Sequence, residues 1–138
     1  MTLNQTCNDM GVYYENRSES RVSIHRGKGL MFTALRWPER LAGLIGLSCY
    51  LPIAEKLAAE AHPANSGLPV FMAHGTLDPV VPFFLGEKAR DILREQGCEV
   101  VWRDYPMSHE VCEQEISDLR KWLLWAFSGE GPVTSTSP

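Results

Sequence analysis

The sequence predicts an α/β fold in which helices flank a parallel β-sheet. Short apolar runs typical of buried strands alternate along the chain with stretches of helical periodicity. The connections between these runs are short, and the sequence contains no internal repeat. Because a buried parallel sheet needs helices over its faces, this alternation favours an α/β arrangement.

Length and charge narrow the function classes. The chain has 138 residues, enough for one domain, and carries 13 Lys and Arg against 17 Asp and Glu. The net charge of −4 disfavours a nucleic-acid partner, which would require a basic surface. No apolar run is long enough to span a membrane, and residues 1–10 lack the pattern of a signal peptide. We therefore expect a cytoplasmic protein with no membrane span and with free cysteine thiols.

The first predicted elements follow a stretch without regular pattern. Residues 1–28 are polar and irregular, apart from an apolar cluster at 12–14 that allows one stray strand. Residues 30–36 have the composition of a helix end, which Pro38 stops. Residues 41–48 are almost entirely apolar and are typical of a buried strand.

The remaining elements complete an ordered region over residues 29–128. Residues 82–96 are predicted to form a helix, because Pro82 suits a first turn and Gly97 suits a C-terminal end. The other predicted elements are a helix at 53–61, strands at 69–73 and 99–105, a final helix with an apolar stripe (Cys112, Ile116, Leu119, Leu123 and Ala126), and a flexible tail over 129–138. Three strands leave at least one long unpaired edge, so we expect self-association through an exposed sheet edge.

Two side chains with catalytic chemistry follow neighbouring predicted strands. Asp78 lies in the loop HGTLDPVVP after the second strand, and His109 lies in PMSHEV after the third. The carboxyl ends of parallel strands meet at one rim of the sheet, where ligands and catalytic groups gather. A carboxylate followed by a histidine matches the second half of the Ser-Asp-His relay in the chain order of α/β-hydrolases. The carboxylate would fix the imidazole tautomer, and the free ring nitrogen would take a proton from a nucleophile.

Each of these residues also has a simpler interpretation. Asp78 is in a place to cap the helix that begins near Pro82, and His109 is in a place to open the last helix. Their joint position at matching strand ends favours the catalytic interpretation. Two further residues at this rim are expected to have structural roles: His74 precedes a glycine at a strand end, and Cys49 has no sequence neighbour that would lower its pKa.

Three segments carry a more specific pattern. They are TALRWPERLAGLIGLSCYLP (33–52), PVFMAHGTLDPVVP (69–82) and YPMSHEVCEQEISDLRKWL (105–123). On these segments the chain, from about residue 30 to 127, resembles the C-terminal part of the phospholipase/carboxylesterase family, the bacterial carboxylesterases and acyl-protein thioesterases. The resemblance implies a partial α/β-hydrolase fold and hydrolysis of a small-molecule or acyl-protein ester or thioester. It also implies Asp78 as the acid and His109 as the base, with no cofactor and no metal.

The serine of the relay is where the resemblance fails. In the family a GFSQGG elbow leads into the helix that ends in TALR, which places the elbow at about residues 22–27. VSIHRG stands there, with Ile24 at the position of the serine. Ser23 is one place off, and Arg21 and His25 occupy the flanks where the strained elbow needs glycine. We therefore do not expect Ser23 to be a nucleophile.

The loss of pattern before residue 29 leaves two functions open. The loop that would complete an oxyanion hole is absent as well, which indicates a truncation, a rearrangement or a reading-frame change upstream. The first function is a family-type serine hydrolase whose activity is impaired in this chain. The alternative is a catalytically inactive remnant that acts as a binding or interaction module, and an unrelated small α/β domain fits the paired motifs less well.

Overall fold

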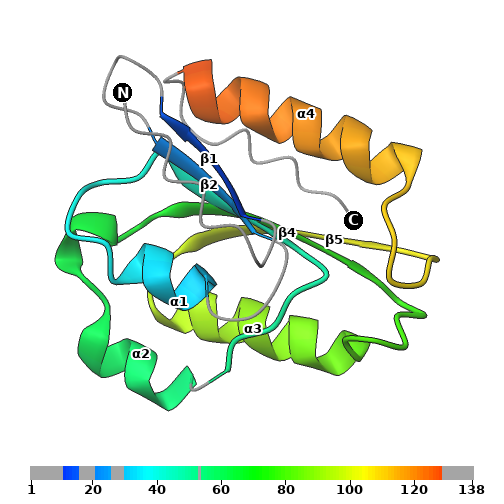
Figure 1. The fold of residues 1–138 in the computed structure, drawn as a ribbon, viewed down its shortest axis with the longest axis horizontal. Coiled ribbons are helices and arrows are strands. Elements are labelled where there is room, and N and C mark those ends of the chain that lie inside the picture. The colour runs from blue at the N-terminus through cyan, green and yellow to red at the C-terminus, as the bar shows by residue number, and fades with distance from the viewer. Residues whose placement is uncertain (1–10, 16–20, 26–29, 53, 129–138) are drawn as a thin grey trace.

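The computed structural model describes residues 11–15, 21–25, 30–52 and 54–128 of the chain. Within them, strands alternate with helices from the second strand onward (Figure 1). In chain order the elements are β1 (Gly11–Glu15), β2 (Arg21–His25), α1 (Leu30–Leu35), β3 (Gly43–Leu47), α2 (Ala54–Glu60), a short 3-10 turn (Pro63–Asn65), β4 (Pro69–Gly75), α3 (Phe83–Glu95), β5 (Glu99–Tyr105) and α4 (Glu113–Ser128).

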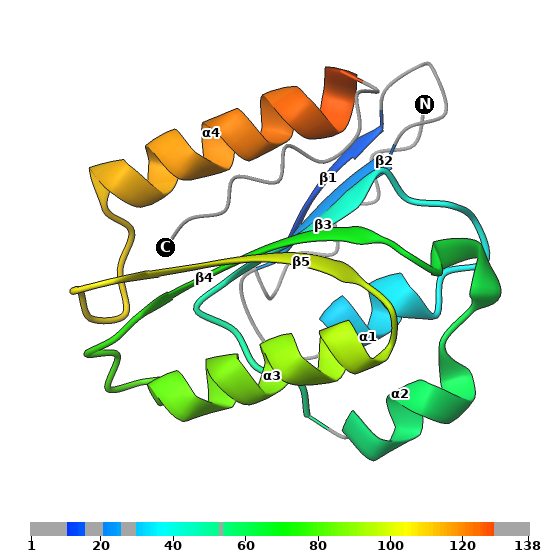
Figure 2. The ribbon, with the colours of Figure 1, turned by 180° about the vertical axis from the view of Figure 1, so that it is seen from behind.

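The strands form one sheet in the order β1-β2-β3-β4-β5. The pairs from β2 to β5 are all parallel, whereas β1 runs antiparallel to β2. Helix α4 covers one face of the sheet, and α1, α2 and α3 lie on the other, as both views show (Figures 1 and 2). The predicted α/β class, a parallel sheet with flanking helices, is confirmed.

The main difference from the sequence prediction lies before residue 29. Residues 11–15 form β1, where the sequence allowed a stray strand at 12–14, and residues 21–25 form β2, where irregular structure was expected. The cluster at 12–14 belongs to β1, and β2 adds a fourth parallel strand beside β3. The other residues of the 1–28 segment, and the predicted tail at 129–138, lie outside the described residues. Backbone pairing with β3 selects β2 as a strand although its sequence has no buried-strand pattern.

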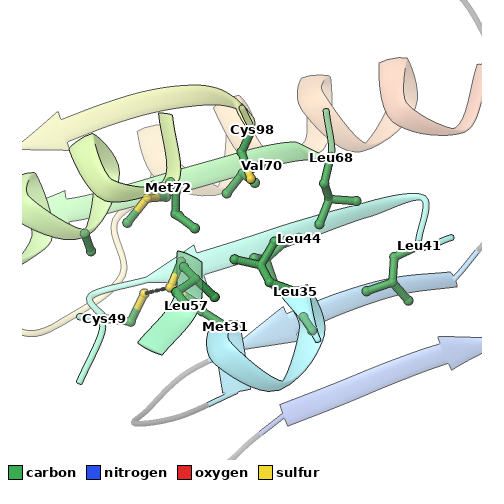
Figure 3. Close-up of a cluster of buried hydrophobic side chains, with 13 residues drawn as sticks. Met31, Leu35, Leu41, Leu44, Cys49, Leu57, Leu68, Val70, Met72 and Cys98 are labelled. Atoms are coloured by element: carbon green, nitrogen blue, oxygen red, sulfur yellow. Dashed lines mark hydrogen bonds between the residues drawn. The ribbon is translucent and has the colours of Figure 1, made fainter. Parts of the chain in front are cut away.

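Two hydrophobic clusters fill the space on either side of the sheet. Successive residues of a strand point to opposite faces, and β4 shows the consequence. Val70 and Met72 join the cluster beneath α1, α2 and α3, which Figure 3 shows in close-up, while Phe71 and Ala73 pack under α4. All four side chains are almost fully buried, so β4 is the centre of the core. Burying each of the larger ones contributes roughly 1.5–3 kcal/mol to folding before entropy is counted.

Helix α4 packs on the sheet through most of its predicted apolar stripe, because Cys112, Leu119, Leu123 and Ala126 all contact the cluster beneath it. Ile116, an expected core position, is 57% exposed, whereas Glu115 beside it is fully buried. Leu119 and Trp122 follow Glu115 at spacings of four and three and pack on the sheet. The predicted stripe is therefore confirmed except at Ile116, and Glu115 takes the buried position beside it. No described helix is both long and apolar enough to cross a membrane.

Candidate active site

The loops that follow β4 and β5 are joined to each other along their backbones. The acid loop (residues 76–82) begins where β4 ends, and the histidine loop (residues 106–112) begins where β5 ends. The amide of Thr76 donates to the carbonyl of Tyr105 at 2.9 Å, and the amide of Leu77 donates to the carbonyl of Met107 at 3.1 Å. Parallel pairing of β4 with β5 is thus continued into the two loops.

Gly75 allows this close approach. A Cβ atom at Gly75 would come within 2.3 Å of the carbonyl oxygens of both Met107 and Ser108. These are backbone atoms, so a side chain could be accommodated only if the histidine loop moved. The absence of a side chain at Gly75 therefore lets the acid loop and the histidine loop lie close together.

Asp78 and His109 meet across these loops. His109 Nδ1 lies 2.8 Å from Asp78 Oδ2, and the carboxylate is fully buried while the imidazole side chain is 32% exposed. A carboxylate can only accept a hydrogen bond, so Nδ1 carries the hydrogen. In the neutral ring, Nε2 is then left as the acceptor on the partly exposed imidazole.

Backbone donors keep the Asp78 carboxylate charged. Its Oδ1 accepts hydrogen bonds from the amides of Val80 at 2.8 Å and Val81 at 2.9 Å. Burial, the largest single influence, would raise the pKa of Asp78. The bonds from His109 and from the two amides together outweigh it and hold that pKa below its ordinary value of 3.8. Asp78 is therefore an anion at neutral pH.

The simpler interpretations of these two residues do not fit the geometry. The N-cap of α3 is Pro82, without a side-chain cap hydrogen bond, and Asp78 instead closes a local turn with Val80 and Val81. Helix α4 begins at Glu113, four residues after His109. Neither residue is therefore a helix cap.

Ser23 lies within a strand. It is the middle residue of β2 and is paired with Tyr13 of β1 and Leu44 of β3. A nucleophile elbow holds its serine in the sharp turn between a strand and a helix. The segment between β2 and α1 is RGKG at 26–29, which contains no serine and lies outside the described residues.

Sequence reasoning missed Ser48, which directly follows β3 at the same rim as Asp78. It is buried, its amide donates to the carbonyl of Ala73 at 2.8 Å, and its φ of 52° is the one positive value among the described non-glycine residues. Strained backbone of this kind concentrates at functional sites. The available signal was Gly46 two residues before Ser48, but Tyr50 stands where an elbow would have its second glycine. A search for a nucleophile therefore has to include Ser48.

The other polar groups near the site do not assemble a second centre. Burial raises the pKa of the Cys49 thiol to about 12, and its Sγ lies 3.5 Å from Met31 Sδ (Figure 3). The thiol therefore stays protonated at neutral pH. Among the described residues, no group of three or more His, Cys, Asp or Glu side chains could hold a metal ion.

Comparison with known proteins gives the same relationship from sequence and from structure. A phospholipase/carboxylesterase family model matches residues 30–126, which begins in α1 and so excludes β1 and β2. Acyl-protein thioesterase 1 of Neurospora crassa is 41% identical over 97 residues, which are 67% of this chain and 39% of that protein. The chain spans about two-fifths of the length of the curated relatives that it matches.

Solved structures agree with this relationship. Acyl-protein thioesterase 2 of Zea mays is 31% identical with a TM-score of 0.59, over 65% of this chain and 42% of that one. The esterase PE8 is 30% identical with a TM-score of 0.63, over 68% of this chain and 43% of that one. The fold is thus a partial α/β-hydrolase fold, and the chain belongs to the phospholipase/carboxylesterase family.

Proposed function

We propose that this chain carries the acid and base of a Ser-Asp-His hydrolase that acts on carboxylic esters or acyl thioesters. The single observation that carries the proposal is the 2.8 Å contact between His109 Nδ1 and a fully buried Asp78 Oδ2. A histidine held in this way has its tautomer and orientation fixed, and its second nitrogen is free to accept a proton.

In the proposed mechanism, His109 moves one proton twice. Its Nε2 takes the proton of the attacking hydroxyl as that oxygen bonds to the acyl carbon, and then returns it to the leaving alcohol or thiol. Asp78 remains ionised throughout and stabilises the imidazolium that forms between the two transfers. A water molecule then repeats the sequence on the acyl-enzyme, with His109 again as base and acid.

An acyl substrate fits the side chains that these loops expose. Leu77 and Val80 flank Asp78 and are 68% and 66% exposed, and Phe84 in the first turn of α3 is 64% exposed. Val111, two residues after His109, is 40% exposed. Apolar surface of this kind around a polar centre favours a ligand with a hydrocarbon part, whether a small ester or an acylated protein.

The alternative is that this chain does not turn over esters and serves as a binding or interaction module. The observation in its favour is Ser23 in the middle of β2, outside the turn where an elbow serine belongs. Without an activated nucleophile, His109 has no hydroxyl to deprotonate. We therefore expect no turnover of a p-nitrophenyl ester above the rate with free imidazole, and no labelling by a fluorophosphonate probe. Labelling mapped to Ser23 or Ser48 by peptide mass spectrometry, and abolished by its replacement with alanine, would contradict this alternative.

A restored chain tests the roles of Asp78 and His109 directly. Replacing residues 1–28 with the upstream half of an intact family member should restore esterase activity, because both loops here are complete. In that background His109→Ala removes the base and Asp78→Asn favours the wrong tautomer. Changes of these two kinds lower kcat by about 10⁴–10⁶-fold in serine hydrolases. Because the triad acts as a unit, the double variant should be barely slower than His109→Ala alone.

Two matched variants control for general damage at the same rim. Cys49→Ala and His74→Gln alter buried side chains near the dyad without removing the acid or the base, so each should cost far less than the changes to Asp78 or His109. Retention of most activity by His109→Ala, or its abolition by a folded His74→Gln, would show that the roles have been assigned to the wrong residues.

A further inference from the structure

His74 is buried directly beneath the acid loop. The residue is 1% exposed and lies near the carboxyl end of β4. Its ring stacks on Trp102 of β5, with centroids 6.4 Å apart and planes 18° apart, and meets the edge of Phe83 at 5.9 Å. A Cβ atom at Gly86 of α3 would come within 2.5 Å of His74 Nδ1, so the ring packs against the helix backbone itself. The imidazole is therefore held on several sides by packing.

The one ring nitrogen that faces the acid loop makes a hydrogen bond to it. His74 Nε2 lies 2.8 Å from the carbonyl oxygen of Val81 and 3.5 Å from Asp78 Oδ2. A carbonyl oxygen only accepts, so Nε2 carries a hydrogen; in the neutral ring Nδ1, towards Gly86, then carries none. Val81 is consequently held at both ends, because its amide donates to Asp78 Oδ1 while its carbonyl accepts from His74.

The two oxygens of the Asp78 carboxylate have different neighbours. Oδ1 is occupied by the amides of Val80 and Val81. Oδ2 lies between the Nδ1 of His109 and the Nε2 of His74. A rotation of the carboxylate that weakened its bond to His109 would also disturb its bond to the amide of Val81. The carbonyl of the same residue is held by His74.

We propose that His74 is a positioning residue: through Val81 and Asp78 Oδ2 it aims the acid at His109 and so fixes the tautomer of the base. His74 itself touches no reacting atom. The inference deepens the proposed function, on which its catalytic meaning rests, but it describes the resting dyad and can be tested without any turnover. A failed ester assay would therefore leave its test intact.

Two substitutions separate hydrogen bonding from packing at this position. His74→Leu keeps an apolar side chain against Trp102 and Phe83 but removes the donor. His74→Gln keeps an amide N–H that can reach the Val81 carbonyl. As a packing control, Phe83→Leu removes an aromatic contact of His74 and leaves its donor in place.

The measurement is the ring tautomer of each histidine in the full chain, from long-range proton–nitrogen NMR spectra of histidine-labelled protein at neutral pH. We expect His74 in the Nε2–H form and His109 in the Nδ1–H form, with a downfield Nδ1 proton bonded to Asp78. That proton signal should be lost in His74→Leu and kept in His74→Gln and Phe83→Leu. His62, whose Nδ1 accepts from the amide of Ala64 at 3.0 Å, is an internal reference that should not change.

Each outcome decides for or against the proposal. An unchanged His109 proton signal in a folded His74→Leu variant would overturn it, as would equal loss of that signal in His74→Gln. If His74→Leu fails to fold, the unsubstituted chain and His74→Gln still decide. A hydrogen on Nδ1 of His74 in the unsubstituted chain contradicts the proposal, and an Nε2–H form together with a retained signal in His74→Gln supports it.

Discussion

Asp78 is a buried anion whose charge is stabilised by hydrogen-bond donors. Burial raises the pKa of Asp78. Two backbone amides donate hydrogen bonds to Oδ1 and the His109 imidazole donates one to Oδ2, and together these bonds hold that pKa below 3.8. A carboxyl group with a lowered folded-state pKa stabilises the fold at every pH above its unfolded value. That stabilisation is lost as the pH falls through the folded value.

The first prediction concerns this pH dependence. Asp78→Asn removes the anion and places an amide hydrogen-bond donor or a weaker acceptor opposite His109. We expect the free energy of unfolding at pH 7 to fall by about 1–3 kcal/mol, the usual cost of a lost charged hydrogen bond. The decrease in stability on acidification below about pH 4 should also become shallower. Denaturant titrations from pH 7 to pH 2 measure both effects.

Asp91 provides the matched control for that experiment. It is exposed, and its pKa is lowered by a hydrogen bond from the neighbouring Arg90. Solvent screens such a surface pair, so Asp91→Asn should leave the unfolding curves almost unchanged. Equal behaviour of the two variants would mean that burial does not distinguish Asp78 from a surface carboxylate.

At the level of elements, the site depends on how closely the ends of β4 and β5 approach. The second prediction is that Gly75→Ala breaks the dyad, because its Cβ would meet the carbonyl oxygens of Met107 and Ser108 at 2.3 Å. The histidine loop must then move, at a cost of about 1–3 kcal/mol in stability. The NMR signal of the His109 Nδ1 proton should be lost, and denaturant titration should show the destabilisation.

Gly43→Ala separates loss of the dyad from loss of stability. Gly43 begins β3 at the opposite end of the sheet, and its Cβ would meet Trp122 of α4 at 2.7 Å. This variant should be destabilised through repacking of Trp122 but should keep the His109 signal. A Gly75→Ala protein that retained the signal would show that the histidine loop tolerates the side chain.

The elements show where reading the sequence succeeds and where it fails. The strand at 99–105 was predicted with the boundaries of β5, because its pattern is local and glycine and a turn delimit it. β2 could not be predicted, because its strand conformation depends on pairing with β3, for example of Val22 with Gly43, and no local window of sequence contains both strands. The apolar face of α4 was predicted correctly except at Ile116, because Glu115 is buried where hydrophobicity alone would place Ile116.

The same distinction applies to the site. The meeting of Asp78 and His109 could be predicted, since each follows a recognisable strand and parallel strands bring their carboxyl ends together. The contacts of His74 to Val81 and Trp102 could not, because they arise only from tertiary packing. The strain at Ser48 was equally invisible, because a positive φ at a serine has no signature in the sequence.

On the scale of the whole molecule, the sheet has β5 at one edge. Glu99 donates its amide towards β4, to the carbonyl of Leu68 at 3.0 Å, and backbone groups alternate in direction along a strand. The amides of Val100, Trp102 and Asp104 therefore point outward, away from β4. Among the described residues, arginine side chains donate hydrogen bonds to the outward carbonyls of Val100 and Trp102. An edge strand whose amides point away from its sheet is a template for pairing with a second strand.

The third prediction is that the chain self-associates through β5. Light scattering after size exclusion should give a dimer or larger species. Asp104→Pro removes an outward amide without touching the ladder to β4, so it should shift the population to monomer. Asp104→Ala keeps that amide and should associate like the unsubstituted chain, which separates edge pairing from loss of the side-chain charge. A sharp monomer peak for the unsubstituted chain, with one cooperative thermal transition, would contradict this prediction. It would mean that β5 does not pair with a second chain and that the chain folds stably as a monomer.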